Sequence, residues 1–137
     1  MSGRLAGRVA IVTGGGQGIG AAITQRFCEA GASVVIAQRN AAVGEAHAAA
    51  LRAAGHTALS IPTDIAEREQ VDALVERTVE AIGPPDVLVN NAGIGIYRDP
   101  LTMTDDDWRR CFAVDLDGAW FATRAVLPHM LARGRGS

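Results

Sequence analysis

Arg8-Val-Ala-Ile-Val-Thr-Gly14-Gly-Gly-Gln-Gly18-Ile-Gly20 is the stretch that predicts the fold, because a short apolar run passes directly into a glycine-rich turn. The residues that follow, up to Gly31, have the length and composition of a helix. Glycines at positions 14, 18 and 20 allow a tight turn and a close approach of the backbone to phosphate oxygens. Free N–H groups at the start of the helix would attract negative charge. A turn of this kind in a βαβ unit predicts a site for a dinucleotide pyrophosphate.

Short apolar runs alternate with longer helix-like segments over most of the chain. The expected strands are residues 9–13, 33–37, 57–61 and 87–90, and the expected helices are residues 19–30, 41–54 and 67–82. Gly31, Gly55 and Gly83 follow these helices at the position of a C-terminal cap. The alternation predicts an α/β fold of the Rossmann type, a doubly wound parallel sheet with strand order 3-2-1-4.

The composition is that of a folded protein without a nucleic-acid partner. The chain has 137 residues, 48% hydrophobic and 20% charged, and its net charge is −2. This length predicts one domain over residues 1–137. The basic residues are scattered arginines and form no stripe, so we expect no binding to nucleic acid.

The ionisable and sulfur-containing side chains predict neither a metal site nor a disulfide framework. His47, His56 and His129 are separated and lack partners at metal-ligand spacing. Cys28 and Cys111 stand singly in expected helices, which is typical of reduced thiols. The sequence has no secretory apolar core and no apolar run of about 18 residues. We therefore expect a cytoplasmic protein without membrane contact.

A long helix is expected in the last third of the chain. Thr104 can cap its start, and the three aspartates at 105–107 suit the positive end of the helix dipole. Apolar or small residues then recur every three or four positions: Trp108, Phe112, Leu116, Ala119, Thr123, Val126 and Met130. This stripe predicts a helix face that lies in the core or forms an exposed apolar patch.

Two motifs carry a resemblance to a known family. The glycine spacing over residues 14–20 is G-x-x-x-G-x-G, and Asn90-Asn-Ala-Gly93 follows the fourth expected strand. The chain thereby resembles the short-chain dehydrogenase/reductase family in its cofactor signature and its sheet-stabilising signature. The resemblance extends over nearly all 137 residues, including the long helix. It implies an NAD(P)-binding oxidoreductase that transfers hydride between a nicotinamide and a carbonyl or alcohol.

The resemblance also implies which residues bind the dinucleotide. It assigns the pyrophosphate to the glycine-rich turn, the adenine to the end of the third strand, and the ribose and nicotinamide floor to the second motif. The residues in that order are Gly14, Gln17, Gly18, Ile19 and Gly20; Asp64 and Ile65; Asn90, Ala92 and Gly93.

The end of the second expected strand indicates the type of cofactor. A carboxylate there would bind the ribose hydroxyls of NAD, but this chain has Gln38 followed by Arg39. A guanidinium suits the 2′-phosphate of NADP by charge and by its planar donors. We therefore predict NADP as the preferred cofactor. NAD stays open, because Arg39 could also be a solvated loop residue.

The catalytic residues of the resembled family are not found in this chain. That family uses a serine, a Tyr-x-x-x-Lys pair and a helix asparagine, whereas this chain has no lysine and only one tyrosine, Tyr97. Asp115 stands at the asparagine position, and an ionised carboxylate cannot donate a hydrogen bond. We predict no catalytic residue and no activity for this chain alone, which leaves open whether it is an enzyme.

Residues 131–137 resemble the segment that leads into the family's fifth strand. We therefore expect a Rossmann domain that is incomplete relative to the family, with an open edge at the fourth strand. Trp120 and Phe121 would be exposed. These features predict a homo-oligomer, a complementing second chain, or a rearrangement of the last helix over that edge.

Three functions are consistent with these observations. The chain can be one part of an oxidoreductase, inactive by itself. It can be a dinucleotide-binding module without chemistry. It can also be an oligomerising interaction protein that keeps only the scaffold, in which case it would fold but bind no nucleotide.

Overall fold

Four parallel strands form a single sheet in the order β3-β2-β1-β4 in the computed structural model, which describes residues 3–137. The elements are β1 (Val9–Thr13), α1 (Gly18–Glu29), β2 (Ser33–Gln38), α2 (Ala41–Ala53), β3 (Ala58–Pro62), α3 (Arg68–Ala81), β4 (Val87–Val89), α4 (Asp105–Phe112), η1 (Ala113–Asp117) and α5 (Gly118–Arg133). From β1 to β4, each strand and helix begins and ends within one residue of the expected bounds. The predicted strand order and parallel pairing are confirmed.

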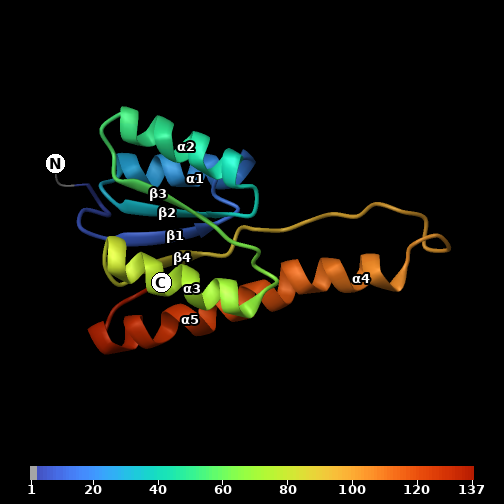
Figure 1. The fold of residues 1–137 in the computed structure, drawn as a ribbon. Helices are drawn as coiled ribbons and strands as arrows, with labels where there is room; N and C mark the ends of the chain where they lie inside the picture. Colours follow the sequence, from blue (N-terminus) through green and yellow to red (C-terminus); the bar gives the residue numbers. More distant parts are fainter. Residues whose placement is uncertain (1–2) are drawn as a thin grey trace.

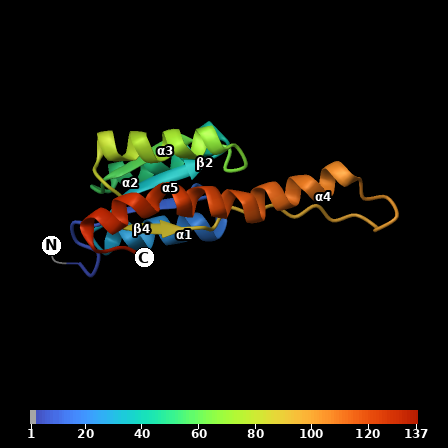
Figure 2. The same cartoon turned by 90° about the horizontal axis from the view of Figure 1, so that it is seen from below.

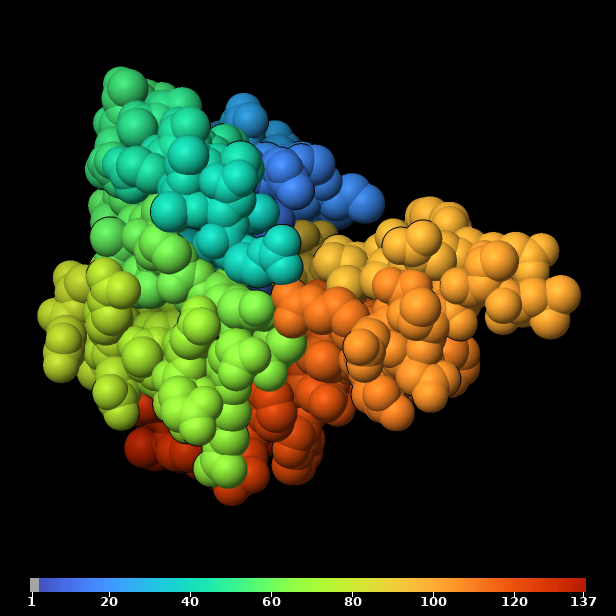
Figure 3. All heavy atoms as spheres, turned by 45° about the vertical axis from the view of Figure 1, so that its right-hand side comes forward, coloured from blue at the N-terminus to red at the C-terminus, as the bar shows by residue number. Residues whose placement is uncertain are grey.

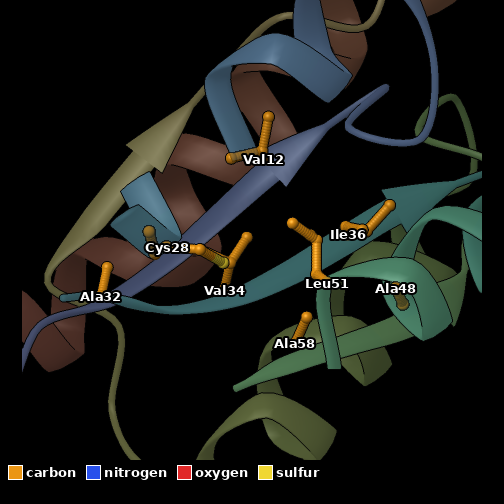
Figure 4. Packing of buried hydrophobic residues seen from close by; sticks show 9 residues of the cluster. Val12, Cys28, Ala32, Val34, Ile36, Ala48, Leu51 and Ala58 are labelled. Atoms are coloured by element: carbon orange, nitrogen blue, oxygen red, sulfur yellow. The ribbon is translucent and has the colours of Figure 1, made fainter. Parts of the chain in front are cut away.

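Helices cover both faces of the sheet, with α1 and α2 on one face and α3 and α5 on the other (Figure 1). Neighbouring residues of a strand point to opposite faces, so each strand supplies two cores. Figure 4 shows the first core, where Val34 and Ile36 of β2 lie near Cys28 of α1 and Leu51 of α2. The second core lies on the opposite face and contains Ile11, Val35, Ala37, Ile61, Leu74, Val75, Val126 and Met130. Burial on both faces explains why the strands are almost continuously apolar.

The chain leaves the sheet after β4 and forms an arm, defined here as residues 94–112. The arm consists of an extended loop and α4, and it projects away from the sheet (Figure 1). None of the α4 residues is buried. Thr104 caps this helix as predicted, since its hydroxyl accepts the Asp107 N–H at 3.0 Å and the Asp107 carboxylate accepts the Thr104 N–H at 3.3 Å. The arm therefore has an ordered helix start but little support from the core.

The predicted apolar stripe is divided between solvent and core. The helices α4 and α5 are joined by η1, a π-helical segment, into one long rod (Figure 2). Trp108 and Phe112 are exposed, because α4 extends beyond the edge of the sheet, and Leu116 of η1 is exposed as well. Burial begins in η1 and recurs every four residues, at Val114, Gly118, Ala122, Val126 and Met130. Of the two expected alternatives, the exposed apolar patch applies to the first half of the stripe and the core to the second half.

The outer edge of β4 is partly paired by the end of the chain. Ser137 donates its N–H to the Asp86 carbonyl at 3.0 Å, and its own carbonyl accepts the Leu88 N–H at 2.9 Å. The expectation of an unpaired edge is wrong for these two positions. The reason is that Gly134 ends α5 in a left-handed conformation, with φ of 63°, and the chain turns back towards β4.

A buried carboxylate anchors the same corner of the sheet. Asp86 is only 2% exposed, and its Oδ2 accepts the Val9 N–H at 3.0 Å. Its Oδ1 lies 2.8 Å from Nε of Arg135, and the guanidiniums of Arg8 and Arg133 lie within 3.5 Å. Asp86 therefore links β1, β4 and the end of the chain at the side of the sheet opposite the glycine-rich turn.

Candidate functional site

A cavity of about 420 Å³ lies at the carboxyl ends of the strands, where parallel α/β sheets bind their ligands. It is bounded by the turn after β1, the ends of β2 and β3, the segment after β4, and α4. Figure 3 shows a notch between the blue glycine-rich segment and the orange arm. The residues expected to bind a dinucleotide that line this cavity are Gly14, Gln17, Ile19, Gly20, Arg39, Asp64, Ile65, Ala92 and Gly93.

Two other expected binding residues do not line the cavity. Gly18 begins α1 with φ of 55°, a conformation that favours glycine, so its place in the motif is explained by the turn. The side-chain amide of Asn90 donates to the Thr123 hydroxyl at 3.2 Å. Asn90 thereby joins the end of β4 to α5.

The glycine-rich turn is closely packed against the segment after β4. A Cβ atom on Gly20 would lie 2.1 Å from the Gly14 carbonyl oxygen and 2.6 Å from Nδ2 of Asn91. Asn91 donates that amide to the carbonyls of Thr13 and Gly14, at 3.0 and 3.2 Å. The sequence motif contains Asn91, but its role in holding the turn follows only from these contacts. A side chain at position 20 would force the turn apart.

Gln38 and Arg39 lie side by side in the sequence but have different surroundings. Gln38 is only 8% exposed, and its Oε1 accepts the Gly16 N–H at 3.0 Å. The Gln38 side chain thus joins β2 to the glycine-rich turn. Arg39 lines the cavity and is exposed, so its guanidinium is accessible to a ligand. The pair supplies no carboxylate at the end of β2.

The carboxylate of Asp64 is held on two sides. Its Oδ1 accepts the Ala66 N–H at 3.1 Å, and its Oδ2 lies 3.2 Å from a guanidinium nitrogen of Arg110. Arg110 comes from α4 and also lines the cavity. Sequence reasoning missed Arg110, because nothing in the spacing of an arginine pair on a helix indicates which one meets a carboxylate 46 residues away.

Asp115 lies on η1, the π-helical segment that follows the arm in the chain. Its Oδ1 accepts the Ile94 N–H at 2.8 Å, so it fixes the start of the arm next to Gly93. An asparagine oxygen could accept the same hydrogen bond. Asp115 therefore keeps the hydrogen-bond acceptor that an asparagine would offer at this position. Tyr97 is 96% exposed on the arm and does not line the cavity.

The cavity fits an extended nucleotide better than a metal ion. The turn offers backbone without Cβ atoms, Arg39 offers an exposed guanidinium after β2, and Asp64 offers a carboxylate after β3, which together form a suitable donor and acceptor set. Within residues 3–137, no group of three His, Cys, Asp or Glu side chains is placed to hold a metal. Over the same residues, no helix combines the length and apolarity needed to cross a membrane.

Comparison with known proteins identifies the family. A family model described as short chain dehydrogenase matches residues 8–137. The NADP-dependent (R)-specific alcohol dehydrogenase of Lentilactobacillus kefiri is 41% identical, with 100% of this chain and 54% of that protein covered. An uncharacterised oxidoreductase of Thermotoga maritima is 42% identical, with 96% and 52% covered.

Solved structures agree with the fold. The crystal structure of gox2181 superposes with a TM-score of 0.93 at 38% identity, over 97% of this chain and 52% of that one. The 3-ketoacyl-(acyl-carrier-protein) reductase of Brucella melitensis, complexed with NADH, has a TM-score of 0.88 at 36% identity, over 96% and 55%. The chain thus spans about half the length of the relatives and structures that it matches.

Proposed function

Because this chain belongs to the short-chain dehydrogenase family, we propose that it is the NADP-binding domain of an oxidoreductase that interconverts a carbonyl compound and an alcohol. The observation that carries the proposal is the glycine-rich turn that opens into the cavity at the carboxyl ends of the strands. We propose further that residues 1–137 form one such domain and that it is located in the cytoplasm. Thiols such as Cys28 and Cys111 stay reduced there.

Each part of the cavity has a proposed role in holding the dinucleotide. The turn formed by Gly14, Gln17, Gly18, Ile19 and Gly20 cradles the pyrophosphate with its backbone N–H groups. Asp64 and Ile65 bind the adenine. Asn90, Ala92 and Gly93 form the ribose contacts and the floor beneath the nicotinamide, and in this role Asn90 acts by holding the end of β4 against Thr123.

The preference for NADP rests on Arg39. Its exposed guanidinium lies at the cavity wall, and a 2′-phosphate there would meet a planar positive donor. Gln38 gives no negative charge to bind the two ribose hydroxyls of NAD, and its oxygen is already occupied by the Gly16 N–H. A related alcohol dehydrogenase is NADP-dependent, whereas a structural neighbour is bound to NADH, so the choice depends on these two side chains.

The chain alone is proposed to bind without turnover. The cofactor would supply a hydride donor or acceptor, and the proton that accompanies it requires a positioned acid or base. Tyr97 does not line the cavity, and the sequence contains no lysine. Asp115 holds Ile94 and supplies no amide donor.

A calorimetric titration with NADPH and NADH tests the proposal. We expect saturable binding with a lower Kd for NADPH. Replacing Arg39 with Gln should weaken the binding of NADPH by about tenfold and change the binding of NADH little. Arg77→Gln, which removes an exposed arginine from α3, is the matched control. Binding of neither dinucleotide by the folded chain would contradict the proposal, whereas a preference for NADH would contradict only the assignment of Arg39.

We also propose that the chain associates with a second copy of itself. The supporting observation is a row of exposed apolar side chains at four-residue spacing along the long helix: Trp108, Phe112, Leu116 and Trp120. Such a row lies on one side of a helix and is costly to leave in water. A complementing chain of another kind would satisfy the same surface.

A further inference from the structure

The peptide group between Gly15 and Gly16 is held at both ends by side chains from different elements. Its carbonyl oxygen accepts a hydrogen bond from Oγ1 of Thr24 on α1, at 3.2 Å. Its N–H donates to Oε1 of Gln38 at the end of β2, at 3.0 Å. This peptide lies in the middle of the glycine-rich turn, and we call this arrangement the loop clamp.

Thr24 connects the loop clamp to a histidine on α2. The Thr24 side chain is fully buried, with 0% exposure. Besides Gly15, its Oγ1 lies 2.8 Å from the Ala21 carbonyl oxygen and 2.8 Å from Nε2 of His47. Nε2 of His47 also lies 3.2 Å from the Ala21 carbonyl oxygen. Three polar groups therefore meet at one hydroxyl that has a single hydrogen to donate.

The contacts of the Ala21 carbonyl determine which group accepts the hydrogen of the Thr24 hydroxyl. A carbonyl can only accept, so a hydrogen bond between the Ala21 carbonyl and His47 uses the tautomer that carries its hydrogen on Nε2. One lone pair of this carbonyl already serves the helix, because α1 continues for two turns beyond Ala21. When His47 donates to the other lone pair, the Thr24 hydroxyl is left to donate to Gly15. Without His47, the shorter bond from Thr24 to Ala21 competes with the bond to Gly15.

The packing of α2 brings His47 into position. Gly44 lies one helical turn before His47, and a Cβ atom on Gly44 would lie 2.4 Å from the Ser60 hydroxyl and 3.0 Å from Cβ of Gln38. A Cβ atom on Gly16 would lie 3.1 Å from the Gly44 backbone. Two glycines thus allow α2 to approach the turn. The contact between His47 and the Thr24 hydroxyl depends on this close approach.

We propose that His47 is a positioning residue for the dinucleotide site and acts on the glycine-rich turn through the Thr24 hydroxyl. This inference rests on the proposed function, because its effect is on pyrophosphate binding. A peptide group fixed at both ends keeps the neighbouring N–H groups of the turn in one orientation. The ligand then does not have to order the turn when it binds.

Isosteric variants separate the hydroxyl from the space that it fills. Thr24→Val keeps the shape of the side chain and removes the donor, while Thr24→Ser keeps the donor. We expect the Kd for NADPH to rise about tenfold in Thr24→Val and to stay within about twofold in Thr24→Ser. His47→Ala should raise it about threefold, and His47→Gln, which restores a donor, should recover part of the loss.

A second ligand that lacks the pyrophosphate distinguishes a specific effect on the glycine-rich turn from a general disturbance of the structure. Adenosine 2′-monophosphate has no pyrophosphate, so its Kd should stay within about twofold in all four variants. Equal weakening of both ligands would overturn the proposal, and so would unchanged NADPH binding in Thr24→Val and His47→Ala. Circular dichroism and thermal melting would show whether each variant is folded.

Amide hydrogen exchange in the ligand-free protein tests the clamp independently of binding. Exchange of the Gly16 N–H should become faster in Thr24→Val and His47→Ala than in the wild type and Thr24→Ser. Faster exchange in a protein that binds no dinucleotide would support the clamp and contradict the proposed function. Unchanged exchange would overturn the inference even if NADPH binds.

Discussion

Arg110 on α4 and Asp64 after β3 form an ion pair with a nitrogen–oxygen distance of 3.2 Å, and both residues line the cavity. They are 46 residues apart in the sequence. The pair is the point at which the otherwise exposed arm is tied to the adenine end of the proposed site. A change in the arm can therefore affect the position of the Asp64 carboxylate.

Replacing Arg110 with Met should weaken NADPH binding by about threefold, because a partly exposed ion pair contributes less than about 1 kcal/mol. The adjacent Arg109 pairs with exposed aspartates of the first helical turn, so Arg109→Met is a matched control. Calorimetry would compare the two variants. Equal effects of both substitutions would contradict a specific role for the pair with Asp64.

Gly20→Ala should abolish dinucleotide binding and lower the free energy of unfolding by about 3 kcal/mol, because its Cβ would collide with the Gly14 carbonyl at 2.1 Å. Gly18→Ala meets no atom within 4 Å and is unfavourable only through its positive φ. We expect it to lower the unfolding free energy by about 1 kcal/mol. Urea denaturation measures the free energy of unfolding of both variants. Similar decreases in the two variants would contradict the close packing of Gly20 against Gly14 as the cause.

Asp86→Asn should lower the unfolding free energy by about 2 kcal/mol at neutral pH, because the buried carboxylate loses its charge beside three guanidiniums. Asn retains an oxygen for the Val9 N–H, so the fold itself should persist. Asp72→Asn is the control, since Asp72 forms an exposed pair with Arg68 at 3.8 Å. Urea midpoints at pH 7 would show whether only the buried site matters.

The stability effect of Asp86 should depend on pH. Burial by itself would raise its pKa, but the Val9 amide and the guanidiniums of Arg135 and Arg133 outweigh burial, so the pKa of Asp86 lies below its ordinary value. A carboxylate with a lowered folded-state pKa stabilises the fold fully above its unfolded pKa of about 3.9. This stabilisation is lost as the pH falls through the folded-state pKa. The stability difference between the wild type and Asp86→Asn should therefore begin to shrink below about pH 3.9 and disappear only below the lowered folded-state pKa of Asp86.

A double substitution, Leu116→Glu with Trp120→Glu, should weaken self-association by about 100-fold, because it places two charges in the exposed apolar row. Trp120 is 59% exposed, so the monomer should stay folded. Sedimentation equilibrium measures the change, and Ala73→Glu on the exposed side of α3 is the control. A wild-type chain that is monomeric at high concentration would contradict association through this surface.

The strands and helices up to β4 could be predicted because their signals are local. Apolar runs, helix-length segments and the glycines after them reflect backbone preferences that hold wherever the segment lies. Asn91 belongs to the Asn90–Gly93 motif, which was also recognised from a short run of neighbouring residues. For the stripe from Trp108 to Met130 the sequence left core and exposed patch open, since periodicity shows that a helix has an apolar face but not how far the sheet extends beneath it.

The sequence by itself determined the Rossmann-type fold, the family and the position of the glycine-rich turn, because these depend on short motifs and on the period of the apolar residues. Only the tertiary structure decided that Arg110 meets Asp64 and that three arginines surround Asp86. It also decided that Thr24 and Gln38 hold the Gly15–Gly16 peptide, with His47 next to Thr24. These contacts join residues from separate elements. Their geometry depends on how closely the helices pack on the sheet, which no local pattern encodes.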